Sequence, residues 1–178
     1  MSIKLLIASA LTFLGCGQTY DNAADKAIGQ STNNKLNMDI NKGFQIDNPK
    51  ILVPWDIDEK ELTDLFNGHV LKHVTTGYYT TDCTSLNGLT CMLGFHFDPR
   101  SNGRLNELEF FRTNYDDKRK SFEEFQTHFV NAFGQPTETA KGNEGFDNYA
   151  WQFNNVQIVH YVFDRFGPEE HMRIKKAK

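Results

Sequence analysis

Hydrophobic residues at every second position predict a β-strand in the middle of the chain. Between residues 91 and 97, large apolar side chains alternate with smaller or more polar ones, a spacing typical of a strand with one buried face. The residues expected on the buried face are Cys91, Leu93, Phe95 and Phe97. A further strand, expected over residues 105–112, completes this half of the chain.

The same spacing recurs towards the C-terminus. Alternation over residues 149–153 predicts a strand, and the Asn-Asn pair at 154–155 predicts a turn into a second strand over residues 156–163. The residues expected to face inward are Tyr149, Trp151 and Phe153 in the first strand and Val159, Tyr161 and Phe163 in the second. A last strand over residues 171–175 completes this half.

A helix is expected before the first group of strands. Either Asp56 or Asp58 can accept hydrogen bonds from its first turn, and the helix runs to about Asn67, where Gly68 ends it. Its apolar face is formed by Leu62, Leu65 and Phe66.

A second helix is expected before the second group of strands. It begins near Ser121, with Glu124 as the partner in a capping box, and ends at Gly134, after which Pro136 prevents continuation. Four phenylalanines at helical spacing form its expected core face, namely Phe122, Phe125, Phe129 and Phe133.

A shift of 66 residues aligns the two halves without a gap. Residues 65–68 then lie over 131–134, and residues 93–98 lie over 159–164. Such a repeat indicates a duplicated unit, although chance similarity between two ordinary halves stays the alternative. We therefore predict an α+β fold, an antiparallel sheet with two helices on one face, built by tandem duplication of a helix–strand–strand–strand unit.

The N-terminus has the layout of a secretory signal. Lys4 precedes an apolar run over residues 5–14, which is too short to cross a bilayer by itself. Gly15 and Cys16 follow the run directly.

The end of this run, residues 13–16, resembles the lipobox of bacterial lipoproteins, with Phe13 where leucine is commoner. The resemblance implies cleavage after Gly15 and a lipid on Cys16. Gly17 follows the cysteine in place of the aspartate that retains such proteins in the inner membrane, which favours the outer membrane. A plain secretory signal is the alternative.

Composition agrees with an exported chain. Removal of residues 1–15 leaves 18 cationic side chains against 23 acidic ones, a formal charge of −5, which disfavours binding to nucleic acid or anionic lipid. Residues 16–46 are polar and lack a sustained period, so they predict a flexible tether, or alternatively a segment that folds on a partner. One domain over 47–178, with halves 47–113 and 114–178, is then expected.

The two cysteines of this domain lie on either side of a predicted hairpin. A two-residue turn would leave Cys83 and Cys91 diagonal to each other. A three-residue loop over residues 86–88 places Gly88 at the left-handed position that such loops favour and pairs the cysteines directly. Because disulfides form in exported proteins, we expect the three-residue loop and a Cys83–Cys91 disulfide.

Few residues indicate catalysis or a bound metal. The histidines and cysteines match no metal motif, and the chain has no serine elbow or glycine-rich phosphate loop, so neither a metal nor a cofactor is expected. Glu107 and Glu109 share one strand face and could act as an acid–base pair, but we interpret them as a solvated strand face. Asp98 and Asp164 recur in both halves and are interpreted as turn residues.

Residues 133–137, Phe-Gly-Gln-Pro-Thr, end the second helix and precede the strand at 149–153. This arrangement resembles the helix–Gly-x-Pro–strand units of outer-membrane assembly lipoproteins of the SmpA/OmlA type, and the duplicated layout is similar to β-lactamase inhibitory protein-like domains. In the first half Val70 stands where the second has Pro136. The resemblance implies a non-catalytic scaffold whose sheet presents aromatic side chains to another protein.

We therefore expect a lipid-anchored, periplasm-facing binding module rather than an enzyme, for example an inhibitor or immunity protein against a toxin or hydrolase. A structural accessory of envelope assembly is the alternative, and an envelope enzyme is the third possibility. The expected partner is a protein, and the membrane is contacted through the lipid. The candidate binding surface comprises Tyr78, Tyr79, Trp151 and Tyr161.

Overall fold

The computed structural model describes residues 38–111, 118–164 and 168–177, which belong to one compact unit. Within these ranges, no helix has the length and apolar character needed to cross a bilayer. The described elements, in chain order, are β1 (Gly43–Asn48), β2 (Ile51–Pro54), α1 (Glu59–Leu65), β3 (Lys72–Thr75), β4 (Tyr78–Ser85), β5 (Leu89–Asp98), the 3-10 helix η1 (Pro99–Ser101), β6 (Arg104–Phe111), α2 (Lys118–Phe133), β7 (Glu138–Lys141), β8 (Asp147–Phe153), β9 (Val156–Asp164) and β10 (Pro168–Lys176).

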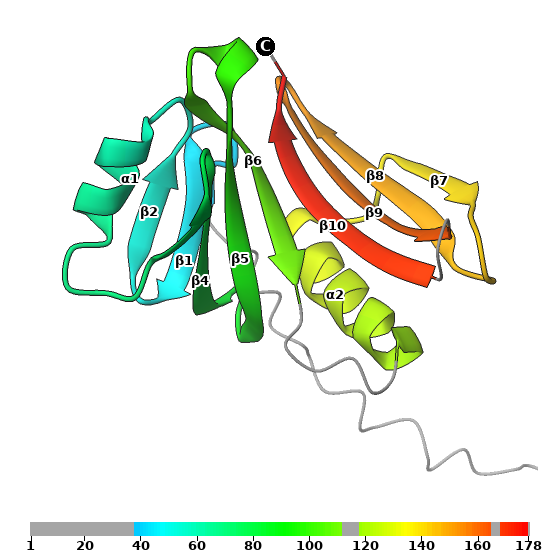
Figure 1. Ribbon diagram of the computed structural model, residues 1–178. Coiled ribbons are helices and arrows are strands. Elements are labelled where there is room, and N and C mark those ends of the chain that lie inside the picture. The colour runs from blue at the N-terminus through cyan, green and yellow to red at the C-terminus, as the bar shows by residue number, and fades with distance from the viewer. Residues whose placement is uncertain (1–37, 112–117, 165–167, 178) are drawn as a thin grey trace, which may run out of the picture. The chain divides into compact units, whose positions relative to one another are not determined.

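All of these strands join one antiparallel sheet. Hydrogen bonds connect nine of them in the order β2-β1-β4-β5-β6-β10-β9-β8-β7, and β3 also pairs with β4. Figure 1 shows the strands up to β6 on one side of the molecule and β10 to β7 on the other, with α2 below the junction between β6 and β10. The fold is therefore α+β, a mostly antiparallel sheet with two helices, as the hydrophobic pattern predicted.

The folded domain begins earlier than the expected boundary at residue 47. β1 starts at Gly43, and Ile40, Phe44 and Ile46 are all buried. The ring of Phe44 lies 5.4 Å from that of Phe110 in β6, in an edge-to-face contact. Apolar residues at spacing two inside a polar stretch form this strand, so the end of the predicted tether is wrong. The predicted lipid site, Cys16, lies outside the described residues.

Helix α1 is capped by Asp58, one of the two residues predicted for this role. The Asp58 side chain accepts a hydrogen bond from the Glu61 N–H, and the Glu61 carboxylate accepts one from the Asp58 N–H, both at 2.8 Å. This reciprocal arrangement is a capping box. Leu62 and Phe66 are buried, and the Phe66 ring contacts Phe95 of β5 at 5.5 Å.

Helix α2 starts at Lys118, so the prediction that Ser121 caps this helix is wrong. Ser121 is instead buried inside the helix, where its hydroxyl donates to Glu170 at 2.9 Å. Three of the four phenylalanines predicted for the core face are fully or nearly buried, namely Phe122, Phe125 and Phe129. The Phe129 ring contacts Phe110 of β6 at 5.3 Å.

The β4–β5 hairpin has the predicted register. Ser85 pairs with Leu89, which leaves the three-residue loop 86–88, and Cys83 lies directly opposite Cys91. Opposite Cα atoms of antiparallel strands are about 4.5–5.5 Å apart, within the range that a disulfide spans. Both cysteines are buried, and the disulfide stays a prediction.

The two long strands differ in which residues face inward. In β5 the predicted residues are buried, including Phe97 at 4% exposure. In β9 the buried residues are Val156, Ile158, His160 and Val162. Phe163 is 45% exposed, so the prediction that it is buried like Phe97 is wrong.

The physical reason for this difference is the length of the preceding turn. The β8–β9 turn has two residues, since Phe153 pairs with Val156, whereas the β4–β5 loop has three. A change of one residue turns every side chain of the following strand to the other face. Because β9 has apolar residues on both of its faces, its own pattern did not indicate which face is buried.

Candidate functional site

The outer face of the sheet, which is the side opposite the buried residues of β5 and β9, carries two rows of side chains across the strands. Directly opposite residues of antiparallel neighbours share one face, so the register defines each row. The first row, from β4 to β8, consists of Tyr78, His96, Glu107, Lys175, Gln157 and Gln152. The second row, from β4 to β7, consists of Thr80, Gly94, Glu109, Arg173, Val159, Ala150 and Glu138.

Arg173 lies at the centre of an ion-pair network on this face. Its guanidinium donates to Glu107 at 2.8 Å and to Glu109 at 2.6 Å. Glu107 also lies 3.1 Å from the Lys175 ammonium, and Glu109 lies 2.8 Å from Nε2 of His96. Two carboxylates therefore balance two permanent cations, and the network links β5, β6 and β10.

Burial and neighbouring charge act in opposite directions on this network. Burial acts to raise the pKa of Glu109, but the hydrogen bond with His96 and the charge of Arg173 outweigh it, so the pKa is lowered from its ordinary value. Burial acts to lower the pKa of Arg173, and the charges of Glu109 and Glu107 outweigh it and raise the pKa. Glu109 is thus an ionised, hydrogen-bonded carboxylate.

Two tyrosine–histidine stacks flank the ion-pair network. Tyr78 lies opposite His96 with ring centroids 4.4 Å apart, and Tyr161 lies opposite His171 at 5.0 Å. Tyr78 crosses Gly94, where a Cβ atom would lie only 2.8 Å from the tyrosine hydroxyl oxygen. Glycine at this position therefore lets the ring lie flat on the sheet. Burial and the charge of Glu109 raise the pKa of Tyr78.

Strand β9 adds an apolar stripe to the outer face. Val159 and Tyr161 are half-buried there, and Phe163, at 45% exposure, lies beside His171 with ring centroids 6.5 Å apart. Apolar side chains on both faces of one strand are expected where both faces become covered. The inner face of β9 is covered by α2 and the core, whereas no described residue covers Phe163 fully.

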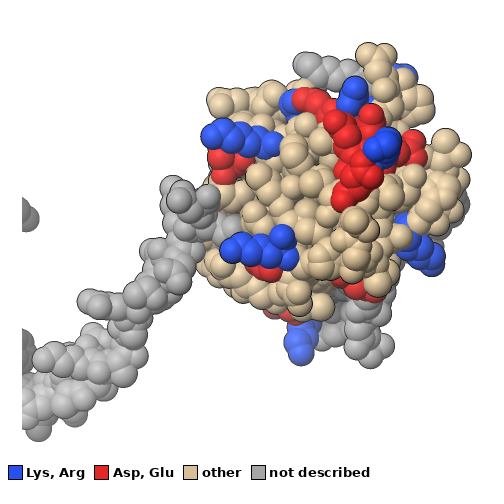
Figure 2. Space-filling view, turned by 90° about the vertical axis from the view of Figure 1, so that its left-hand side faces the viewer, with Lys and Arg blue, Asp and Glu red and all other residues tan. Residues whose placement is uncertain are grey.

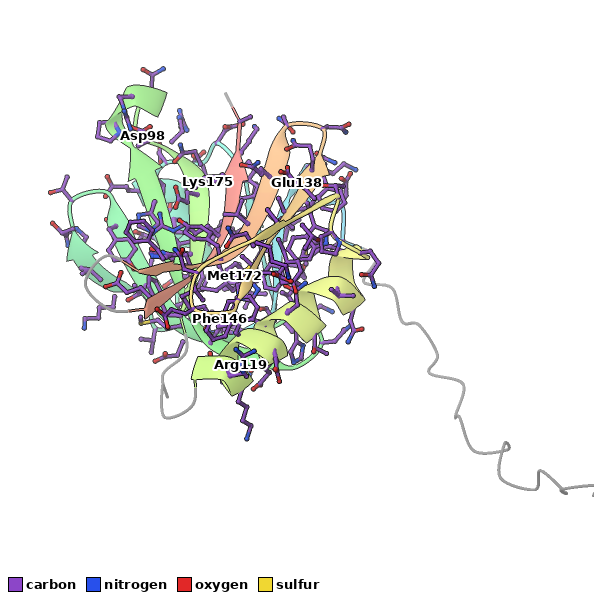
Figure 3. All side chains as sticks on the ribbon, turned by 90° about the vertical axis from the view of Figure 1, so that its right-hand side faces the viewer. Asp98, Arg119, Glu138, Phe146, Met172 and Lys175 are labelled. Atoms are coloured by element: carbon purple, nitrogen blue, oxygen red, sulfur yellow. The ribbon has the colours of Figure 1, made fainter. Side chains whose placement is uncertain are left out.

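Two shallow pockets lie at either side of the network. The larger, about 460 Å³, is lined by residues that include Tyr78, His96, Asp98 and Glu107. The smaller, about 250 Å³, lies over β7, β8 and β9 and is described below. In the view of Figure 3, Lys175 lies between Asp98, at the end of β5, and Glu138, at the start of β7.

The predicted binding residues divide between the two faces of the sheet. Tyr78 lies on the outer face, and so does Tyr161, whose strand was expected to turn it inward. Trp151 is buried at 1% exposure, and its indole N–H donates to the Gly134 carbonyl at 2.8 Å. The Tyr79 hydroxyl donates to Glu59 of α1 at 2.8 Å, on the side of α1. Trp151 is therefore a core residue, and its place in the predicted surface is wrong. Tyr79 is partly buried and contacts α1, so its binding role stays a prediction.

The structure also locates the carboxylates considered for catalysis. Glu107 and Glu109 do share one face, as the spacing of two predicted, but both are paired with Arg173. A general acid needs a raised pKa, whereas that of Glu109 is lowered. Asp98 accepts a hydrogen bond from the Arg100 N–H at 2.8 Å and caps η1, the predicted turn role. The side chain of Asp164 lies outside the described residues.

A second polar network lies inside the protein, between α2 and the sheet. His160 is fully buried, with Nε2 at 2.7 Å from Glu170 and Nδ1 at 3.0 Å from Gln126. Burial lowers the pKa of His160 below its ordinary value, although Glu170 opposes this shift. Its ring stacks on Phe122 at 3.9 Å, so His160 is a core residue.

The side of the molecule that carries α1 has a different chemistry. Figure 2 looks from this side and shows acidic side chains gathered with a few basic ones. Helix α1 and its cap contribute four acidic residues, Asp58, Glu59, Glu61 and Asp64. Arg104 lies 3.1 Å from Glu61, and Lys60 lies 2.6 Å from Asp64. Among the described residues, no group of histidine, cysteine and carboxylate side chains is arranged to hold a metal ion.

Comparison of the chain with family models, with curated proteins and with solved structures finds no match. The resemblance to assembly lipoproteins and to β-lactamase inhibitory protein-like domains therefore remains an expectation from the sequence. Any functional conclusion depends on the geometry of the outer face. The residues that sequence reasoning missed there are His96, His171, Arg173 and Lys175. The spacing of two among His171, Arg173 and Lys175 was the available indication.

Proposed function

We propose that the chain is a non-catalytic, lipid-anchored binding module that faces the periplasm and holds a partner protein on the outer face of its sheet. An inhibitor or immunity protein against a toxin or hydrolase is the form of this function that we favour. The observation that carries the proposal is the apolar stripe of β9, which leaves Phe163 45% exposed beside a charged network.

The composition of the outer face supports protein binding. Interfaces between proteins are rich in tyrosine and arginine and have an apolar centre with a polar surround. The outer face combines Tyr78, Tyr161, Phe163 and Arg173, and its central charges already have partners within the protein. Burying such a network under another protein costs less than burying unpaired charges.

The ion pairs on this face argue against an enzyme of the acid–base type. Glu107 and Glu109 are held by Arg173, so neither is placed to donate or accept a proton during turnover. A role as a structural accessory of envelope assembly differs from inhibition only in the identity of the partner, and the experiment below distinguishes the two.

We further propose that the sheet arose by duplication, with both helices on its inner face. Outward from the β6–β10 junction, β6-β5-β4-β3 on one side corresponds to β10-β9-β8-β7 on the other, and β7 lies 66 residues after β3. Strands β1 and β2, which also follow β4, are additional to the repeat. Phe66 of α1 contacts Phe95, and Phe129 of α2 contacts Phe110. In the register, Phe95 lies opposite Leu108, which is two residues before Phe110 and so shares its face.

The shifted phase of β9 requires a small change to this proposal. The copies cannot be related by one gap-free offset, because the shorter β8–β9 turn removes a residue. The exposed Phe163 is then a difference that the second copy acquired on its outer face, at the position where the first copy has the buried Phe97.

Photo-crosslinking in intact cells tests the proposed function. Benzoylphenylalanine replaces Phe163 in the full chain, and in a matched control it replaces Leu65, an exposed apolar residue of α1. We expect a discrete adduct with one envelope protein from position 163 and none from position 65. Identification of the adduct by mass spectrometry distinguishes a toxin or hydrolase from an assembly factor.

The purified pair should then form a one-to-one complex in light scattering, which excludes capture of an abundant bystander. Equal labelling of many proteins from both positions, or no adduct from any outer-face position, would show that this face is not a docking surface.

A further inference from the structure

The smaller pocket of the outer face has an apolar floor. Ala150 lies between Val159 on β9 and Glu138 on β7, each directly opposite it in the register. The alanine side chain is much smaller than its neighbours, so it leaves a depression of about 250 Å³ over β7, β8 and β9. Small-molecule sites occupy about 300–1,000 Å³, so this depression is better suited to one side chain of a partner.

The walls of this pocket combine an aromatic ring with an acid. Tyr161 lines one side, stacked on His171 at 5.0 Å, which holds its ring in place. Glu138 lines the rim and is exposed. An apolar floor, an aromatic wall and a carboxylate rim match a side chain with a long aliphatic stem and a cationic head.

The state of the carboxylates distinguishes the two pockets of the outer face. In the larger pocket, Asp98 pairs with Arg100 at 3.2 Å, and Glu107 pairs with Arg173 at 2.8 Å. Within the part of the chain that the structure describes, Glu138 makes no ion pair. The charge that would attract a cation is therefore present at the smaller pocket and neutralised at the larger one.

We propose that this pocket takes the side chain of an arginine from the partner protein, an inference that rests on the proposed function. The stem lies over Ala150 and Val159, the guanidinium stacks on Tyr161, and Glu138 accepts its hydrogen bonds. Arginine fits better than lysine because its planar head both stacks on aromatic rings and pairs with carboxylates in a fork.

Titration of the full chain with a defined probe tests this proposal. The probe is N-acetyl-arginine amide, and N-acetyl-citrulline amide, which has the same shape but no charge, is its control. Methyl resonances of Ala140, Ala150 and Val159 report binding in carbon-13-labelled protein. We expect saturable shifts with the arginine probe and weaker binding of the citrulline probe and of a third probe, N-acetyl-lysine amide.

Three variants locate the site. Glu138→Gln should weaken binding about two- to fivefold, the effect of losing an exposed ion pair. Glu123→Gln, which changes an exposed acid of α2 outside the pocket, should leave binding unchanged. Ala150→Leu should fill the pocket and abolish the shifts at Val159, while methyl resonances of the core stay in place and show that the variant folds.

Shifts that do not saturate, equal binding of citrulline, or equal losses in both glutamate variants would overturn the proposal. Such a result would leave the crosslinking experiment at position 163 to decide the proposed function on its own. Arginine binding together with an absence of any crosslinked partner would instead overturn the proposed function.

Discussion

Truncation of two phenylalanines separates the core of this protein from its proposed binding surface. Phe97 ends the buried row of β5 at 4% exposure and contacts the Tyr79 ring edge-to-face at 6.0 Å. Phe163 occupies the position that the 66-residue shift makes equivalent, yet it is 45% exposed. Replacement of each by alanine should therefore affect stability very differently.

The expected magnitudes follow from burial. Phe97→Ala removes a buried ring and leaves a cavity, so it should lower the free energy of unfolding by about 3–5 kcal/mol. Full burial of a phenylalanine side chain stabilises by about 1.5–3 kcal/mol, and Phe163 is only half-buried with no cavity to leave. Phe163→Ala should therefore cost about 1 kcal/mol.

Urea unfolding followed by tryptophan fluorescence measures both values, since Trp55 and Trp151 are both buried in the fold. The slope of the free energy with urea should be the same for both variants and the parent, which shows that the comparison is between like states. A loss at Phe163 as large as that at Phe97 would mean that Phe163 belongs to the core. The apolar stripe would then no longer support the proposed docking surface.

Three further outcomes are expected. Burial lowers the pKa of His160 below 6.5, so the unfolded chain binds more protons than the folded protein near that pH. The free energy of unfolding should therefore fall as the pH drops through 6.5, by at most about 1.4 kcal/mol per pH unit. Urea titrations from pH 8 to 5 measure this dependence, and His160→Gln should flatten it. Cys83 and Cys91 should form a disulfide in the exported protein that stabilises it by about 2–3 kcal/mol, and two reactive thiols in the unfolded, unreduced protein would refute this. Mass spectrometry of the mature N-terminus should find a lipid on Cys16, and an unmodified cysteine or another mature end would contradict the anchor.

The sequence was informative where one periodicity stood alone. The row from Cys91 to Phe97 alternates with small and polar residues, and the structure buries it as predicted. The three-residue loop was also predicted, and Asp58 was one of the two residues predicted to cap α1, because turn and cap chemistry depend on neighbouring residues. These elements needed no knowledge of what lies across the sheet.

The remaining features depend on contacts between distant segments. β9 is apolar at both phases, so only the two-residue turn before it determines that Val159 and Tyr161 face outward. Ser121 looked like a helix cap because its partner, Glu170, lies 49 residues away. The spacing of Arg173 placed it on a strand face, but its partners Glu107 and Glu109 follow only from the register that places β10 beside β6.

The affinity of the complex tests the central claim most directly. Once crosslinking has identified the partner, isothermal titration of the purified pair compares the parent chain with Phe163→Ala and with Leu65→Ala, which truncates an exposed apolar residue of α1. If the outer face is the docking surface, Phe163→Ala should raise the dissociation constant about tenfold or more, as truncation at the centre of an interface does, and Leu65→Ala should leave it unchanged. An unchanged dissociation constant for Phe163→Ala would contradict the assignment of this face.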